Sequence, residues 1–155
     1  MQKRTMRVHS IAGFTLIEIM LAIMVIGLLL SIAVPGYQDY QDRVEINEVI
    51  TDLQALRLTI ESYRIDTGNP PPSLATVGMD GMTDPWGNPY QYVDHTTAPN
   101  GHRRKDKNLV PINSFYDLYS SGEDGASRAP LTAKASRDDI IMANDGGYFG
   151  LAEDY

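Results

Sequence analysis

The stretch GFTLIEIMLAIMVIGLLLSIAVPGY, residues 13–37, decides how this chain of 155 residues is organised. Residues 14–34 contain a single charged side chain, Glu18, and thirteen of these 21 residues are Leu, Ile, Val or Phe. A helix rises about 1.5 Å per residue, so the segment spans roughly 30 Å, the thickness of one hydrocarbon core. We therefore predict a membrane-spanning helix with a carboxylate close to its start.

The carboxylate weakens membrane insertion without preventing it. Each Leu, Ile, Val or Phe contributes roughly −0.3 to −0.6 kcal/mol on the insertion scale, so the apolar residues together contribute about −4 to −8 kcal/mol. A charge at the helix centre costs roughly 3 kcal/mol, and a charge near the end should cost less. Insertion is expected, and an acid that is isolated inside the membrane needs a partner.

The residues before this segment set its orientation. They include Lys3, Arg4 and Arg7 and no acidic residue, so the positive-inside rule predicts a cytoplasmic N-terminus, with the remainder of the chain on the other side. A secretory signal peptide cut near Ala33, or an uncleaved signal anchor, has the same basic start. Neither alternative explains Glu18.

The composition limits the function of the rest of the chain. There are 13 basic and 20 acidic residues, a formal charge of −7, and no cysteine. Without the three bases of the N-terminus, 10 basic and 20 acidic residues leave −10, a poor surface for nucleic acid but one rich in oxygen ligands for a hard cation. Disulfides and thiolate metal sites are excluded. No phosphate loop, nucleophile motif or HExxH appears, so an enzyme is not predicted; a membrane-anchored enzyme or binding protein is the alternative from another class.

The motif GFTLIE, with the basic leader and the apolar span, resembles the processing site of type IV pilins and pseudopilins. The resemblance implies that a prepilin peptidase cleaves between Gly13 and Phe14 and methylates the new amine of Phe14. Glu18 then occupies the family's glutamate position. There it is implied to pair with the N-terminal ammonium of a neighbouring subunit in a helical filament, which would offset its desolvation and set the axial register.

The residues after the span predict a second, amphipathic half of the helix. Pro35–Gly36 is expected to interrupt the helix or to kink it at the membrane edge. In this family, the helix is often locally melted at this point when subunits pack into filaments. Apolar residues then recur at steps of four and three, which predicts a buried stripe under a sheet. They are Val49, Leu53, Leu56, Ile60 and Tyr63. Gly68 and the prolines at 70–72 predict the end of the helix.

The predicted fold class is α+β: a long N-terminal helix packed on a small antiparallel sheet, with a C-terminal calcium-binding loop, as in the lollipop of the type IV pilins. The expected parts are a cleaved leader (1–13), a transmembrane and filament-core helix (14–36) and a soluble head that includes the amphipathic half of the helix (37–155). Turn signals in DPWGN, residues 84–88, precede a strand expected around 90–93, and a second strand is expected to end in FYDLYS, residues 115–120.

A basic cluster lies between these two strands. Its members are Arg103, Arg104, Lys105 and Lys107. We expect an exposed hairpin tip, with a contact patch as the alternative. His95 and His102 are seven residues apart in loop sequence, which is too weak a pattern to predict a metal pair.

The segment DLYSSGEDGASRAPLTAKASRDDI, residues 117–140, is the second informative stretch. It does not have the spacing of an EF-hand. It does place Glu123–Asp124 in a turn flanked by glycines and Asp138–Asp139 on the returning segment. Calcium takes 6 to 8 oxygen ligands from carboxylates and carbonyls, so the two pairs could hold calcium; a solvated acidic loop is the alternative.

The combination of DPWGNPYQY, YDLYSSGEDG and DDI is similar to the C-terminal half of the major pseudopilin of type II secretion systems, which carries calcium in this loop. The resemblance implies one structural Ca²⁺ ion. The implied ligands are Leu118 and Ser121 through their carbonyls, with Asp124, Asp138 and Asp139. The chain departs from the family in the insert ASRAPLTAKASR, residues 126–137, in the continuation after Ile140 and in a shorter stretch between Gly68 and Asp84.

We therefore predict a structural subunit of a periplasmic pseudopilus that drives protein export through a type II secretion system. A subunit of a surface type IV pilus for adhesion, motility or DNA uptake is the alternative. The implied partners are further copies of the chain, minor pseudopilins, the prepilin peptidase, the inner-membrane assembly platform and, before assembly, lipid. No nucleic acid is expected. The expected location is the inner membrane, crossed once, with the head in the periplasm.

Overall fold

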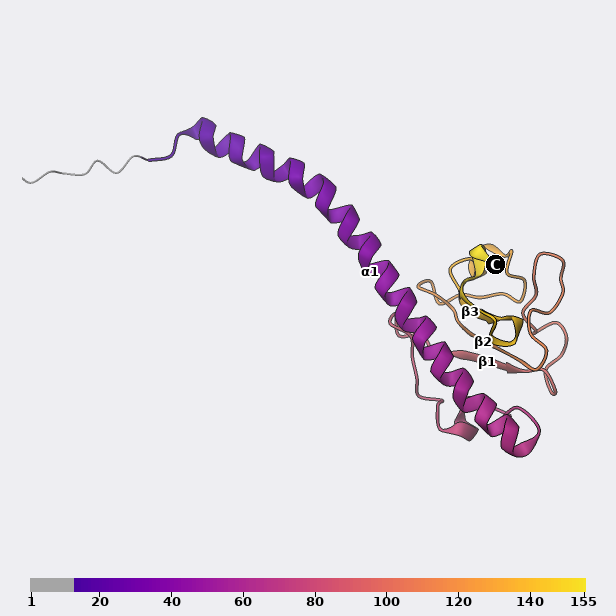
Figure 1. The fold of residues 1–155 in the computed structure, drawn as a ribbon. Coiled ribbons are helices and arrows are strands. Elements are labelled where there is room, and N and C mark those ends of the chain that lie inside the picture. Colours follow the sequence, from indigo (N-terminus) through magenta and orange to yellow (C-terminus); the bar gives the residue numbers. More distant parts are fainter. Residues whose placement is uncertain (1–12) are drawn as a thin grey trace, which may run out of the picture. The chain divides into compact units, whose positions relative to one another are not determined.

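One long helix dominates the chain. The computed structural model describes residues 13–155, and helix α1 runs from Leu16 to Thr67 (Figure 1). The predicted leader, Gly13 excepted, lies outside the described residues, and with it Lys3, Arg4 and Arg7. The chain divides into two compact units after Gln41, inside α1.

The first unit contains the apolar half of α1. Its large apolar side chains are exposed within the chain, with Phe14 at 80% and Leu28 at 65% of their full accessible surface. An 18-residue window reaches a mean hydropathy of 2.7 with none of it buried, so α1 is long and apolar enough to cross a membrane. Water would disfavour this surface by about 25 cal/mol per Å². This half of the helix therefore requires lipid or protein around it.

The interruption predicted at Pro35–Gly36 is wrong for the single chain, because α1 is helical through both residues. Proline removes one backbone donor and crowds the preceding turn. The turns on both sides keep their hydrogen bonds, and long helices accommodate a proline by bending rather than ending. The local melting that the resemblance implies concerns subunits packed in a filament, and it stays a prediction.

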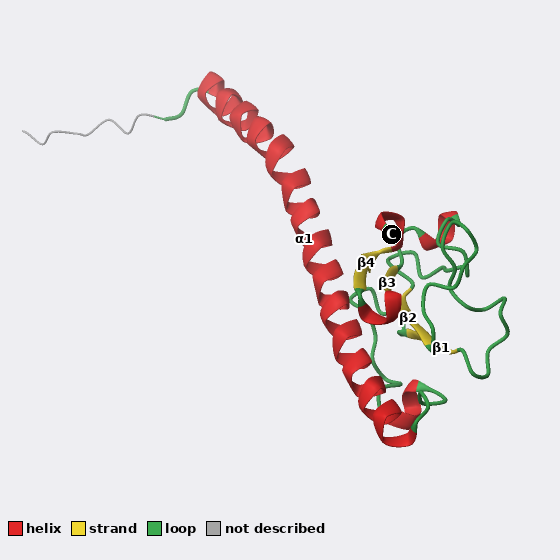
Figure 2. Cartoon of the chain, turned by 45° about the vertical axis from the view of Figure 1, so that its right-hand side comes forward, coloured by secondary structure: helices red, strands yellow, loops and turns green. Residues whose placement is uncertain are grey.

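The second unit, Asp42–Tyr155, packs the other half of α1 on an antiparallel sheet (Figure 2). The strands are β1 (Gln91–Asp94), β2 (Tyr116–Ser120), β3 (Ile140–Ala143) and β4 (Tyr148–Leu151). Their order in the sheet is their order in the chain, β1-β2-β3-β4, and each pair of neighbours is antiparallel. This confirms the predicted α+β class and the two predicted strands.

The helix face that packs on the sheet is the predicted apolar stripe. Val49, Leu53, Leu56 and Ile60 are fully buried, and Tyr63 is half-buried. Leu118, Ile140 and Met142 of the sheet complete this cluster. The helix ends as predicted, because Gly68 takes the left-handed conformation (φ 83°) and its N–H donates to the carbonyl of Arg64 at 2.8 Å.

The C-terminal continuation completes the sheet. Residues after Ile140 form the β3–β4 hairpin, in which Ile140 pairs with Leu151 and Ala143 with Tyr148. Successive side chains of a strand point to opposite faces, so Ile141 and Ala143 join a second, smaller cluster away from α1. Its other buried members are Ile112, Leu131 and Ala152. The sequence had left the role of this continuation open.

Candidate functional site

The start of α1 presents the predicted processing motif. Gly13, Phe14 and Thr15 precede the helix, and the backbone N–H of Glu18 donates to Thr15 Oγ1 at 3.3 Å. Thr15 therefore caps the helix, and Glu18 stands at the position that the acidic member of a capping box occupies. The first turn is also where the helix dipole favours a negative charge. Cleavage after Gly13 would leave the new amine of Phe14 just outside the capped end.

The carboxylate of Glu18 has no cationic partner within residues 13–155. The three ion pairs among them all lie in the second unit. Glu18 is exposed on the single chain, in a helix half whose surface is otherwise apolar. Lipid would impose a desolvation cost on this carboxylate, smaller near the helix end than at its centre. A partner for it must therefore come from outside the described chain, as the resemblance implies.

The glycine before the cleavage point is not required by the fold of the chain. A Cβ added at Gly13 would meet no atom of the described residues within 4 Å. A preference for glycine here must therefore reside in the enzyme that reads the site.

The expectation of an exposed basic hairpin tip is wrong for Arg104, which is 1% exposed. Its backbone is part of the reason, because the Arg104 N–H donates to Asp117 Oδ2 at 2.7 Å and its carbonyl accepts from Ile112 N–H at 3.1 Å. Lys107 does lie on the surface, as expected. Nothing in the run RRKDK distinguishes the buried arginine from its neighbours, so sequence reasoning missed it.

The guanidinium of Arg104 pairs with Asp139, one of the predicted calcium ligands. Asp139 is fully buried, and its Oδ2 accepts from Arg104 Nη2 and from Ser127 Oγ, the latter at 2.7 Å. Burial raises the pKa of the Asp139 carboxyl, and the guanidinium opposes that rise by favouring the charged form. The other oxygen, Oδ1, has no hydrogen-bond partner among residues 13–155.

The remaining predicted ligands lie in β2 and in the loop that follows it, and they are engaged separately. Asp124 is exposed, and its Oδ1 accepts from Ala126 N–H at 2.7 Å within its own turn. Asp138 Oδ2 lies 3.4 Å from the backbone N of Asp124. Leu118 is a core residue, and the buried Ser121 follows the end of β2.

The predicted approach of the two acidic segments is therefore present, but the predicted calcium set does not fit the arrangement. A Cβ at Gly122 would lie 2.5 Å from the carbonyl oxygen of Asp138, so the turn and the returning segment are in direct contact. Yet within residues 13–155 no three His, Cys, Asp or Glu side chains group as a metal site. A guanidinium already neutralises the one fully buried carboxylate of the set. Calcium binding itself stays a prediction.

The DPWGN turn fastens the acidic loop to the sheet. Asp84 is buried, and its two oxygens accept from Asn88 N–H at 2.7 Å and Ser120 Oγ at 2.6 Å. The side-chain amide of Asn88 donates to the carbonyl of Gly122 at 2.9 Å. The sequence predicted the turn but not this connection, because the partners are more than thirty residues apart.

A second buried polar cluster surrounds Asp117 in β2. It accepts from Asn113 Nδ2 at 3.0 Å and from the Arg104 backbone, and His95 Nε2 lies 2.9 Å from its Oδ2. His95 thus has a structural role, whereas His102 is exposed.

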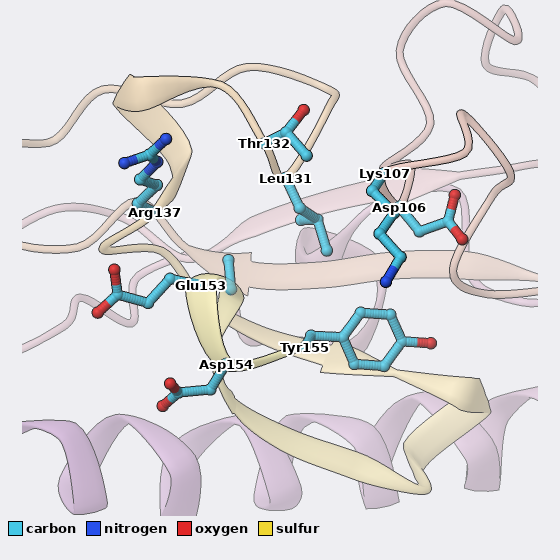
Figure 3. Close-up of a pocket in the computed structure, with 9 residues that line it drawn as sticks. Asp106, Lys107, Leu131, Thr132, Arg137, Glu153, Asp154 and Tyr155 are labelled. Atoms are coloured by element: carbon cyan, nitrogen blue, oxygen red, sulfur yellow. The ribbon is translucent and has the colours of Figure 1, made fainter.

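An open pocket of about 770 Å³ lies near the C-terminus (Figure 3). It is lined by Asp106, Lys107, Leu131, Thr132, Arg137, Ala152, Glu153, Asp154 and Tyr155. Asp106 is occupied by its own turn, because its Oδ1 accepts from the N–H groups of Asn108 and Val110 at 2.8 and 2.9 Å. The Val110 N–H lowers the pKa of Asp106. The lining mixes acids and bases and offers no nucleophile beside a general base.

Comparison with known proteins supports the N-terminal assignment. A family profile described as the prokaryotic N-terminal methylation motif matches residues 9–34. No solved structure matches the chain.

Curated relatives cover most of the chain. This chain is 31% identical over 137 residues to a type II secretion system core protein G of Pseudomonas aeruginosa. The alignment covers 74% of this chain and 84% of that relative. The protein of the same description from Klebsiella michiganensis is 30% identical over 141 residues, 77% of this chain and 89% of the relative. A type IV major pilin protein PilE1 of Neisseria gonorrhoeae is 32% identical over 143 residues, 86% of this chain and 78% of the relative.

Proposed function

Because this chain belongs to the family of type IV pilins and pseudopilins, we propose that it is a structural subunit of a periplasmic pseudopilus. The filament would drive protein export through a type II secretion system. The observation that carries the proposal is the start of α1. It is an exposed apolar helix, capped by Thr15, that presents Glu18 without a cationic partner within residues 13–155.

Processing supplies the missing partner. A prepilin peptidase would cleave between Gly13 and Phe14 and methylate the amine of Phe14. A secondary amine of this kind remains protonated near neutral pH, so it can pair with the Glu18 carboxylate of the adjacent subunit. Pairing removes the cost of an isolated charge among apolar side chains. It therefore favours the assembled state over the subunit in lipid.

The two halves of α1 would have different roles. Before assembly the apolar half would anchor the subunit in the inner membrane, once across, with Asp42–Tyr155 in the periplasm. In the filament, the same apolar surface would be covered by other copies of the chain. The subunit would supply a surface and not a reaction. Such a filament also requires partners: an ATPase on the cytoplasmic side that supplies energy, the assembly platform and the minor pseudopilins.

Processing is tested by mass spectrometry of the chain extracted from membranes. The expected product begins at Phe14 and carries one N-terminal methyl group. An intact Met1, or a product that begins after Ala33, would exclude this function, because in neither case is an amine placed at the capped end of α1.

A surface pilus is the second candidate, and the identity to gonococcal PilE1 favours it as much as the other relatives favour export. Deletion of the gene in its host separates the two. If the chain is a pseudopilin, its deletion is expected to trap exported proteins in the periplasm and to leave surface fibres unchanged. Loss of surface fibres with normal export would assign the chain to a pilus.

A further inference from the structure

We propose that the guanidinium of Arg104 is the built-in cation of the acidic loop, so that residues 117–140 of this head fold without a bound divalent metal. The proposal is independent of the filament function. It concerns only how the head neutralises its fully buried carboxylate, Asp139.

The oxygens around Arg104 are of the kinds that calcium would collect. Its Nη2 donates to the Asp139 carboxylate, and its Nη1 donates to Ser127 Oγ and to the carbonyl of Arg128. Calcium sites use carboxylate, carbonyl and hydroxyl oxygens in the same way. Here a guanidinium provides the positive charge at the point where they converge. The ring of Tyr119, 4.3 Å from the guanidinium carbon, covers another side of the cation.

The burial of both partners makes this pair a structural requirement. The side chain of Arg104 is 1% exposed and that of Asp139 is fully buried. Removing one member of such a pair leaves an uncompensated charge without water, which is strongly destabilising. Arginine also cannot lose its proton under ordinary conditions. A calcium ion at Asp139 would therefore lie beside a permanent positive charge, so the two cations exclude each other.

The insert that distinguishes this loop brings the additional oxygens to the arginine. Ser127 and Arg128 both belong to residues 126–137. The segment that carries Arg104 binds the same insert through its backbone, since Lys105 N–H donates to Ala129 and Leu131 N–H donates to Lys105, both at 2.9 Å. Ser136 then closes the insert by bonding to both the N–H and the carbonyl of Arg128, at 2.7 and 2.9 Å. The insert and the arginine thus form one unit.

The experiment uses the full chain in detergent micelles. Trp86 is the only tryptophan and lies in the DPWGN turn, which is bonded to the acidic loop through Asn88. Its fluorescence therefore reports unfolding of the head. Melting is compared in calcium and in excess EGTA, for the wild type and for Arg104→Met, which keeps the unbranched apolar stem of the side chain and removes its charge.

The wild type is expected to melt at the same temperature in calcium and in EGTA. Arg104→Met is expected to melt more than about 10 °C lower in both. The matched control is Lys107→Met, an exposed charge from the same basic run, with an expected change within about 2 °C. A wild-type melting temperature that falls in EGTA, or an Arg104→Met chain as stable as the wild type, would overturn the proposal.

A double variant keeps the test decisive if Arg104→Met does not fold. Arg104→Met with Asp139→Asn removes both charges, so no uncompensated ion remains. It is expected to fold and to recover at least half of the lost melting temperature. If the double variant is no more stable than the single one, loss of packing and not loss of charge explains the effect, and the proposal fails. Arg104→Lys, which keeps the charge but not the fork of donors, is expected to lie between the wild type and Arg104→Met.

Discussion

Two regions of this molecule each hold a carboxylate in unfavourable surroundings, and they provide for it in different ways. In the head, Asp139 is fully buried and Arg104 of the same chain neutralises it. In the apolar half of α1, Glu18 has no cationic partner within residues 13–155. Asp139 therefore has its counter-charge within the head, whereas the described residues supply none for Glu18.

The same comparison applies to the two halves of one helix, which need different surroundings. The amphipathic half of α1 buries Val49, Leu53, Leu56 and Ile60 against the sheet. The apolar half buries none of its membrane-length window. One half needs only its own chain, and the other half needs lipid or neighbouring subunits.

The largest effect on filament assembly is expected when cleavage fails and the Phe14 amine, the proposed partner of Glu18, is never formed. Gly13→Glu should abolish cleavage, because the peptidase would have to accept a bulky charge at its cut, and the amine of Phe14 would not appear. Gly13→Ala adds only a methyl group and no charge at the cut, so we expect it to be cleaved. Mass spectrometry of the N-terminus measures both. Cleavage of Gly13→Glu at the wild-type rate would contradict the processing proposal.

The next largest effect is expected from a substitution that removes the Glu18 carboxylate and leaves the Phe14 amine. Glu18→Val should be inserted and cleaved normally, because an uncharged side chain makes insertion easier, but it should not assemble. Filament yield by electron microscopy and by shearing measures this. Ser31→Val is the matched control: its hydroxyl only bonds back to the carbonyl of Leu28 at 2.7 Å in the same helix, and its filaments should persist. Normal filaments from Glu18→Val would refute the pairing.

In the head, the corresponding change is Asp139→Ala, which leaves Arg104 buried without its counter-charge. The free energy of unfolding should fall by about 3–5 kcal/mol, measured by denaturant titration of Trp86 fluorescence in micelles. Glu18→Val should leave the same quantity unchanged. A loss below about 1 kcal/mol would mean that water reaches the guanidinium, and the contrast between the regions would disappear.

A smaller loss is expected where the acidic loop is fastened to the sheet. Asp84→Ala leaves Ser120 Oγ and the N–H of Asn88 without their acceptor. A buried polar group without a partner costs about 1–3 kcal/mol. The same fluorescence titration measures it. Asp80→Ala, an exposed acid close by in the sequence, serves as the control and should change stability little.

The smallest effect is expected at Asp124, although the resemblance implies that it is a calcium ligand. Asp124→Ala removes only the bond from Ala126 N–H in an exposed turn, so the loss should be about 0.5–1 kcal/mol. If calcium bound here and its free concentration were about 100 times its Kd, losing the bound ion would cost roughly 2.7 kcal/mol of stability. A loss of that size, matched by EGTA on the wild type, would restore the calcium site and refute the role proposed for Arg104.

The sequence by itself determined the features that depend on neighbouring residues. The apolar run and its single carboxylate predicted the exposed half of α1. The spacing from Val49 to Ile60 predicted the buried half, and Gly68 predicted the end of the helix. These succeed because helical periodicity and helix termination are local properties of the chain. Pro35 was misread for the opposite reason: the effect of one missing hydrogen bond depends on the turns around it.

Only the tertiary structure decided which cation serves the buried acid. Arg104 and Asp139 are far apart in the sequence, and the run RRKDK reads as a solvated tip. The sheet register brings them together: β2 and β3 pair as neighbours, and the insert folds back over the segment that carries the arginine. A buried charge needs a partner that is withdrawn from water together with it. Which residue that is depends on the tertiary contacts. The sequence thus showed that Glu18 needs a partner and left Asp139 between a calcium ligand and a solvated acid; the fold showed that Asp139 is buried against Arg104.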